Sequence, residues 1–423
     1  MSVQLTRLAN GLVVASDPMD SVESVSVGVY VGVGTRHERA EHNGVAHILE
    51  HMAFKGTTTR TARDIAEQVE AVGGIMNAHT GREQTAYYVK LLKEDLKLGV
   101  DLIADILINS VFDPEELERE RGVILQELGQ VEDTPDDVIF DRFQTAAFPG
   151  QALGRPVLGT AEIIKSLPRQ AVIDYQRRHY GASTMVVAAA GKVDHGNLVA
   201  LVERAFGAVS PGADARHDPA RYIGGAARDE SELEQVHFVL GYPGVSFSDP
   251  DYYAISTLST LLGGGMSSRL FQEIREKRGL CYSISSFAAS YLDGGLFGIY
   301  TGTGESEIAE MIPVLAEELA KVGRPPPEDE VRRARAQMKA GLLMSLESTN
   351  ARADALASQL LIFGRPIPPE EVAQRIEAVS AEDVARVARR IFSGPLTLAA
   401  MGPLGRLEAS ARVAERLGTT LAA

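Results

Sequence analysis

The residues with the clearest types and spacing for chemistry are His47, Glu50 and His51, in the run His-Ile-Leu-Glu-His. The surrounding segment, 44–55, has the apolar spacing of a helix, and Asn43 is predicted as its N-cap. Residues four apart lie on one side of a helix, so the two imidazoles can bind one divalent cation. The Glu50 carboxylate lies between them, where it can reach a water activated by that cation. The spacing therefore predicts a metal centre with its own general base.

The same segment has a second interpretation, a polar stripe on the protein surface. Its apolar residues gather on the opposite side of the helix, where they can pack on a sheet: Val45, Ile48, Leu49 and Met52. Phe54 shares the side of the two histidines, and a large aromatic ring is seldom left free in solvent. The opposition of the two faces favours the metal centre, and the surface stripe remains the alternative.

A catalytic zinc site has three protein ligands and one open position, so a third ligand must come from another element. A helix is predicted to begin at Asp113-Pro114. Six glutamates are candidates: Glu115, Glu116, Glu118, Glu120, Glu127 and Glu132. Glu120 and Glu127 share one helix face, about 10 Å apart along the axis, so one is predicted as a ligand and the other as a partner that orients an imidazole. The spacing does not decide which, and a charged helix surface is the alternative for both.

The elements that must position these residues follow a regular order in the first half of the chain. Alternating valines from Val25 to Val33 predict a strand with one packed face. The segments that follow it are predicted as helix 44–55, helix 61–72, strand 75–80, strand 85–91, helix 94–109 and a helix from 113.

The second half of the chain repeats this order. Residues 211–228 mix Pro, Gly, Ala and charges, which is typical of a linker. The predicted elements after it are strand 236–242, helix 251–262, a break at 263–265, helix 268–277, strands 283–289 and 295–301, helices to about 392 and strand 396–401. We therefore expect domains at 1–212 and 229–423, joined by a linker at 213–228. The predicted fold class is α+β, with two similar domains that each have a mainly antiparallel sheet and helices packed on one face.

Composition narrows the possible partners and compartment. The chain of 423 residues has 42 basic and 57 acidic residues and a net charge of −15, which disfavours nucleic acid as a partner. Cys281 is the only cysteine, which suits a reducing compartment. The first residues lack the apolar core of a signal peptide, and no apolar stretch is long enough to span a bilayer. A cytoplasmic location without a membrane partner is expected.

Three stretches resemble the pitrilysin family of zinc peptidases, in the branch of the mitochondrial processing peptidase and its bacterial relatives. They are His47–Thr57, Gly73–Thr80 and Glu118–Glu127, and the similarity extends through nearly the whole chain. The resemblance implies that Glu127 is the third zinc ligand. It also implies that Glu120 does not bind the ion itself but contacts one of the ligands and orients it. The second half has no His-x-x-Glu-His, so one zinc ion per chain is expected.

The resemblance also implies residues that act on the substrate. Arg275 and Tyr282 correspond to an arginine–tyrosine pair that holds the substrate carbonyl and the tetrahedral intermediate, and both side chains can donate hydrogen bonds to developing negative charge. The alternative is an ordinary arginine at a helix end and a half-buried tyrosine. Asn77, Ala78 and Thr80 mark a sheet edge that can bind an extended peptide. For Asn77, the alternative is a side chain that bonds its own loop.

These features together predict a zinc-dependent endopeptidase that hydrolyses peptides or unfolded segments inside a closed chamber. Family members enclose substrate between two half-length chains or within one double-length chain. A chain of this length therefore resembles the half-length form, and we expect a homodimer whose active site is shared between chains. The alternatives are a leader-processing peptidase that works with a partner subunit and a non-catalytic structural relative. Retention of every predicted zinc ligand disfavours the non-catalytic alternative.

Overall fold

A computed structural model describes residues 3–421, which fold into two compact units. The first unit consists of the residues up to 129 together with 156–218 and 344–367. The second unit consists of 130–155, 219–343 and the residues from 368 onward. Each unit therefore includes one segment from the opposite half of the sequence, and each has its own sheet and hydrophobic core.

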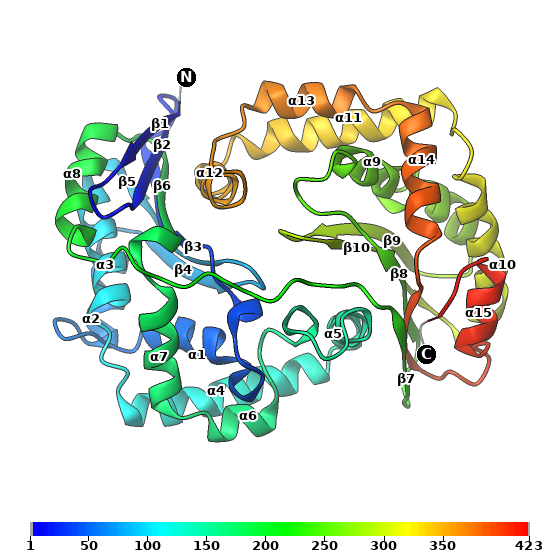
Figure 1. The fold of residues 1–423 in the computed structure, drawn as a ribbon, viewed down its shortest axis with the longest axis horizontal. Helices are drawn as coiled ribbons and strands as arrows, with labels where there is room; N and C mark the ends of the chain where they lie inside the picture. The colour runs from blue at the N-terminus through cyan, green and yellow to red at the C-terminus, as the bar shows by residue number, and fades with distance from the viewer. Residues whose placement is uncertain (1–2, 422–423) are drawn as a thin grey trace. The chain divides into compact units, whose positions relative to one another are not determined.

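The sheet of the first unit has the strand order β1-β2-β6-β3-β5-β4 (Figure 1). The strands are β1 (Gln4–Arg7), β2 (Val13–Pro18), β3 (Ser24–Val31), β4 (Ile75–Thr80), β5 (Thr85–Leu92) and β6 (Met185–Gly191). Neighbouring strands are antiparallel except for β2 and β6, which are parallel. Because β4 is the last strand on its side, one of its edges has no partner strand within the described part of this unit.

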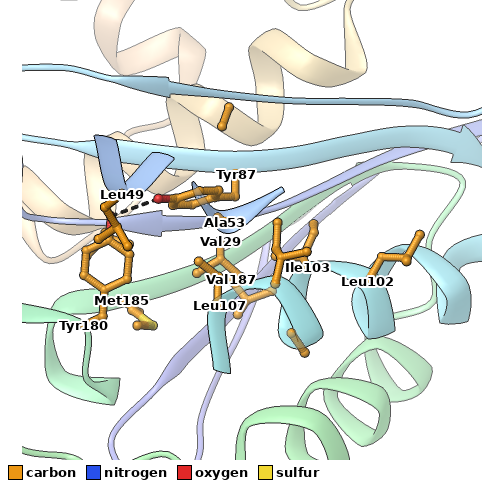
Figure 2. Close-up of a cluster of buried hydrophobic side chains, with 14 of the residues drawn as sticks. Val29, Leu49, Ala53, Tyr87, Leu102, Ile103, Leu107, Tyr180, Met185 and Val187 are labelled. Atoms are coloured by element: carbon orange, nitrogen blue, oxygen red, sulfur yellow. Dashed lines mark hydrogen bonds between the residues drawn. The ribbon is translucent and has the colours of Figure 1, made fainter. Parts of the chain in front are cut away.

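Helices of the first unit share a core on one face of this sheet. They are α1 (Val45–Ala53), α2 (Ala62–Ala71), α3 (Leu96–Ile108), α4 (Pro114–Glu132), α6 (Ala161–Ser166), α7 (Arg169–His179) and α8 (His195–Phe206). The odd-numbered valines of β3 point to this face because side chains alternate along a strand. Figure 2 shows Val29 of β3 packed among Leu49 of α1 and Leu107 of α3. This packing fixes the helix that carries the two histidines.

Helix α12 (Thr349–Phe363) packs on the opposite face of the first sheet, although it comes from the second half of the chain (Figure 1). Leu356 and Ala357 are buried there beside Tyr30 of β3. The guanidinium of Arg352 pairs with Asp17 of β2 at 2.6 Å. The sequence pattern does not predict that α12 packs on the first sheet. An apolar helix face shows that the helix is buried on that side, but not which sheet it packs against.

The sheet of the second unit has the order β7-β11-β8-β10-β9. Its strands are β7 (Gly225–Glu230), β8 (Val236–Pro243), β9 (Ser283–Ser290), β10 (Gly295–Thr303) and β11 (Thr397–Gly402). Here β7 and β11 are the parallel pair, and the other neighbours are antiparallel. This order and direction match β2-β6-β3-β5-β4, so the predicted α+β class with two similar domains is confirmed.

Helices of the second unit also divide between two faces. The helices are α5 (Pro135–Ala147), α9 (Tyr252–Gly263), α10 (Glu305–Lys321), α11 (Glu328–Ser345), α13 (Pro369–Glu377), α14 (Ala381–Phe392) and α15 (Ser410–Arg416). Helix α5, from the first half of the chain, buries Ile139 and Phe143 beside Val239 of β8 and Ala399 of β11. The compact units thus differ from the contiguous blocks 1–212 and 229–423 by an exchange of segments that include α5 and α12.

Helix α1 begins differently from the sequence expectation. It starts at Val45 after Gly44, which has a φ of 96°, and Asn43 does not cap it. The carboxylate of Glu38 caps it instead, by accepting the backbone N–H groups of Gly44 and Ala46 at 3.0 and 2.9 Å. A side chain at position 44 would meet Ile164 and the Leu158 carbonyl within 2.8 Å, so a glycine is required there.

Smaller departures occur elsewhere. Strand β7 begins at Gly225 inside the predicted linker, and the predicted helix 268–277 contains a π-helical segment, η6 (Phe271–Glu276). Short 3₁₀ turns are η1 (Thr35–His37), η2 (Ala40–His42), η3 (Lys93–Asp95), η4 (Ala152–Gly154) and η5 (Ala182–Thr184). Across residues 3–421, the helices are too short or too polar to cross a bilayer.

Candidate metal centre

Helix α1 presents its two histidines on the side away from the core. Ile48 and Leu49 are buried in the core of the first unit, while the side chains of His47 and His51 are 13% and 17% exposed. The two ring centres are 4.6 Å apart. The apolar and polar faces predicted for this helix are therefore present, and the histidine face is sheltered from solvent.

Helix α4 brings Glu127 to the same place. Its Oε2 lies 3.9 Å from Nε2 of His47 and 3.6 Å from Nε2 of His51. Within residues 3–421, these three residues form the only group of His, Cys, Asp or Glu side chains whose ligand atoms converge, all within 4.8 Å of one another. The expected trio of His47, His51 and Glu127 thus lies together.

The geometry and chemistry of this trio fit zinc. Two ligands bound tetrahedrally at zinc distances lie about 3.4 Å apart, close to the separations between Glu127 and the two rings. Burial, together with the neighbouring His51, lowers the pKa of His47 to about 4. The His47 imidazole is therefore neutral at neutral pH, which is the form that binds a metal. Its Nδ1 is buried without a hydrogen-bond partner in the described chain, so packing must hold this ring.

Glu120 lies behind His51. Its Oε2 is 3.0 Å from Nδ1 of His51, and its Oε1 accepts a hydrogen bond from Lys55 at 2.6 Å. Burial alone would raise the pKa of Glu120, but the hydrogen bonds from Lys55 and His51 lower it overall, so the carboxylate is ionised. An ionised Glu120 favours a proton on Nδ1 of His51 and leaves Nε2 facing Glu127. The role of Lys55 was not predicted, although its position one turn after His51 was a usable signal.

Glu50 is paired with β4. The hydroxyl of Thr80 donates a hydrogen bond to its Oε2 at 2.5 Å. Burial raises the pKa of Glu50 despite this hydrogen bond, which makes the carboxylate a stronger base than an exposed glutamate. Thr80 is expected from the sequence to contact the substrate, and in the structure its hydroxyl is bonded to Glu50, the predicted general base.

The other two predicted substrate contacts lie beside Thr80 on β4. Ala78 is buried, and its backbone N–H donates to Oδ1 of Asn77 at 2.9 Å. The Asn77 side chain therefore satisfies its own strand, which is the alternative raised for it from the sequence. A peptide that adds to this edge has to accept Asn77 in that arrangement or displace it.

Arg275 and Tyr282 lie next to one another in the second unit. The Cζ atom of Arg275 is 4.5 Å from the ring centre of Phe271 and 5.4 Å from that of Tyr282. The Tyr282 side chain is 77% exposed, unlike the half-buried residue of the alternative reading. An exposed hydroxyl beside a guanidinium is available to a ligand carbonyl.

Comparison with known proteins connects this geometry to a family. The family model described as "Insulinase (Peptidase family M16)" matches residues 13–161, and "Peptidase M16 inactive domain" matches residues 166–338. An uncharacterized zinc protease of Rickettsia felis is 38% identical over 400 residues, covering 94% of this chain and 97% of its own length. The chain belongs to peptidase family M16. This confirms the resemblance to the pitrilysin family of zinc peptidases.

Other relatives of this M16 chain include both bacterial and plant proteins. An uncharacterized zinc protease of Bacillus subtilis is 36% identical, with coverage of 94% of this chain and 98% of its own. A probable mitochondrial-processing peptidase subunit beta of Arabidopsis thaliana is 38% identical, with coverage of 95% and 78%. The second family model is described as inactive, which agrees with a second half that lacks His-x-x-Glu-His.

Two solved structures share the fold of this M16 chain. A protease from Helicobacter pylori has a TM-score of 0.87 at 24% identity and covers 95% of this chain and 99% of its own. A chain of complex III2 from Candida albicans, with Inz-5 bound, has a TM-score of 0.88 at 21% identity and covers 99% and 100%. At these identities the likeness establishes the fold alone.

Proposed function

We propose that this chain is a zinc-dependent endopeptidase that hydrolyses peptides or unfolded segments within an enclosed chamber. One observation carries the proposal: the ligand atoms of His47, His51 and Glu127 converge, and Glu50 follows on the same helix. Membership of peptidase family M16 supports zinc as the metal and peptides as the substrate class. One such group in the described chain supports one zinc ion per chain.

The residues of the centre divide the work between them. His47, His51 and Glu127 would hold the ion, and Glu120 with Lys55 would orient His51. Zinc bound in such a site polarises a carbonyl and lowers the pKa of water toward ~7. The contribution of the chain is to hold the two imidazoles and one carboxylate close together, where they can bind the ion.

Glu50 would move the proton. Its Oε2 is held by the Thr80 hydroxyl, and its Oε1 has no hydrogen-bond partner among residues 3–421. Oε1 is therefore available to accept the proton of the attacking water. When the C–N bond breaks, the same carboxyl group gives that proton to the leaving amine, so Glu50 ends the cycle ionised.

Strand β4 would hold the substrate. An extended peptide can pair with the backbone of an edge strand and thereby tolerate many side chains. Asn77, Ala78 and Thr80 lie on that strand, and Thr80 also contacts Glu50. A peptide paired along β4 would consequently run past the general base.

Arg275 and Tyr282 would stabilise negative charge on the substrate carbonyl oxygen, because both are hydrogen-bond donors. We propose that they do so across a homodimer, with the second half of one chain completing the zinc site of the other. A relative named as a subunit of a processing peptidase supports assembly from more than one chain.

A leader-processing activity is the second candidate, and the 38% identity to a probable mitochondrial-processing peptidase subunit beta favours it. Such an enzyme would cleave precursors at one position and need a different partner subunit. A general endopeptidase would cleave unrelated peptides without one. Incubation of the purified chain with unrelated peptides and with a leader-bearing precursor separates the two candidates.

The test of the proposal is cleavage of a quenched fluorescent peptide library by the zinc-loaded protein. We expect the wild type to cleave and Glu50→Gln to lose at least about a hundredfold in kcat, because the variant has no group to accept the proton. Glu132→Gln is the matched control, since this exposed glutamate on α4 lies outside the converging group. A wild type that binds zinc and leaves every peptide intact would refute the proposal.

A further inference from the structure

The substrate strand β4 has two faces, and the zinc-side face is only one of them. Thr80 points toward α1, where it meets Glu50. His79 is the preceding residue, so it points to the α12 side of the sheet. A peptide paired with β4 also alternates its side chains, so every second substrate side chain must face α12.

A cavity of about 240 Å³ lies on that side. It is lined by Tyr30, His79, Tyr88, Asn350, Ala351 and Asp354, which come from β3, β4, β5 and α12. Its β4 residue, His79, is exposed, and the His79 ring centre lies 6.1 Å from that of Tyr88. This volume is several times that of one water in the liquid, which is about 30 Å³. The cavity is therefore large enough for a long side chain.

The cavity contains a carboxylate without a partner. Asp354 is partly buried on α12, and it has no hydrogen bond or ion pair within residues 3–421. His79 lies close enough to affect it electrostatically but does not form an ion pair with it. Burial raises the pKa of Asp354, which indicates that the charged form lacks compensation. A positively charged group in the cavity would supply it.

The second unit fills the corresponding place differently. Phe140 is the sixth residue of α5, as Asp354 is the sixth residue of α12. The Phe140 ring lies 5.4 Å from the ring of Tyr300 and 5.5 Å from that of Phe287. In the second unit, aromatic rings thus fill the space between the helix and the sheet. A carboxylate at the sixth position of the helix, as in Asp354, is therefore not required for helix–sheet packing in this fold.

We propose that this cavity is a substrate subsite, in which Asp354 and the rings of Tyr30 and Tyr88 receive a lysine or arginine side chain of a peptide on β4. The inference rests on the proposed peptidase function, because it requires a peptide along that strand. The long stem of a basic side chain packs on the aromatic rings, and its charged end pairs with the carboxylate. The subsite therefore gives the enzyme a preference for basic peptides.

The test moves one lysine through an otherwise uncharged peptide, and it measures both kcat/KM on active protein and Kd on the Glu50→Gln variant. We expect lysine at one position to raise kcat/KM and to tighten binding. Asp354→Asn should lower the lysine-to-neutral ratio about tenfold, because a hydrogen-bonded charge pair is lost. Glu347→Gln removes the same charge from an exposed residue just before α12 and should leave the ratio as in the wild type.

Two results would overturn the subsite. One is a wild type that cleaves and binds all lysine positions and the neutral peptide alike. The other is an Asp354→Asn variant that keeps the lysine preference. Failure of the proposed function looks different: no peptide would be cleaved, while the lysine-dependent Kd and its loss in Asp354→Asn would persist if the subsite is real.

Discussion

At the scale of residues, Glu120 and Glu127 have the same chemistry and the same helix, yet their surroundings give them different tasks. The Glu120 side chain is 6% exposed and forms an ion pair with Lys55, so its negative charge is already balanced within the protein. The Glu127 side chain is 38% exposed and faces both Nε2 atoms. The paired carboxylate of Glu120 can orient His51, whereas the carboxylate of Glu127 can bind a cation.

The sequence predicted the part of this centre that depends on helix geometry alone. His47 and His51 are four residues apart on one helix, and no tertiary contact is needed to place them together. The choice between Glu120 and Glu127 depends on how α4 crosses α1, so the spacing left it open and only the family resemblance implied it. The contact between Thr80 and Glu50 also joins two elements, and the sequence gives no sign of it.

At the scale of elements, the segment that follows the metal helix is anchored by one carboxylate of α3. Oδ2 of Asp105 accepts hydrogen bonds from Thr57, Thr59 and Arg60 at 2.7, 2.8 and 2.9 Å, and Oδ1 accepts one from Asn109 at 2.8 Å. Asp105 is 4% exposed. Burial would raise its pKa, but these hydrogen bonds outweigh burial and lower it below the ordinary value of 3.8.

This anchor predicts a defined pH dependence of stability. A pKa that is lower in the folded state stabilises the fold above the unfolded value, and the stabilisation is lost as the pH falls through the folded value. Asp105→Asn should therefore destabilise the fold by roughly 1–3 kcal/mol at pH 7. In urea-unfolding midpoints, the difference between wild type and variant should stay constant from about pH 7 to 5 and shrink below about pH 4.

The control for this prediction is Asp101→Asn. Asp101 also pairs with Arg60, at 2.5 Å, but its side chain is 59% exposed. An exposed pair contributes less than about 1 kcal/mol, so this variant should unfold close to the wild type. Equal effects of the two substitutions, or a difference for Asp105→Asn that does not change with pH, would show that Asp105 is not the anchor.

The arrangement of the elements could be predicted only in part from the sequence. Repetition of element order predicted two similar sheets, and the strand orders agree. Helices α5 and α12 were not assigned to the sheet of the opposite half. Residues such as Ile139 and Leu356 show in the sequence only that a helix face is apolar, not which sheet covers it. Residues 225–228 of strand β7 were interpreted as part of the linker because the segment mixes Pro, Gly, Ala and charges. Periodicity finds an element and its buried face, while the partner of that face is a property of the tertiary fold.

At the scale of the whole molecule, the proposed homodimer has a consequence that can be measured by mixing two inactive variants. Glu50→Gln disables the zinc half of a site, and Tyr282→Phe disables the other half. If each site combines two chains, a mixed dimer has one site with both defects and one intact site. Random exchange of subunits should then restore about a quarter of the wild-type activity, since half of the dimers are mixed and each has one working site.

A site contained within one chain gives the opposite result. Each mixed dimer would then carry two separately damaged sites, and mixing would restore nothing. Light scattering before and after mixing verifies that the chains are dimeric and have exchanged. Activity that stays at the level of the separate variants after exchange would contradict the shared site, while leaving the zinc centre itself intact.

The proposed function depends on the binding of one zinc ion by His47, His51 and Glu127, and the zinc content of the dialysed protein measures that binding. We expect one zinc ion per chain in the wild type and none in Glu127→Ala or His51→Ala. Glu120→Gln should still bind zinc, about 10–100-fold more weakly, because it loses only the residue that orients a ligand. A wild type without zinc, or a Glu127→Ala variant that retains one zinc ion per chain, would contradict the proposed metal centre.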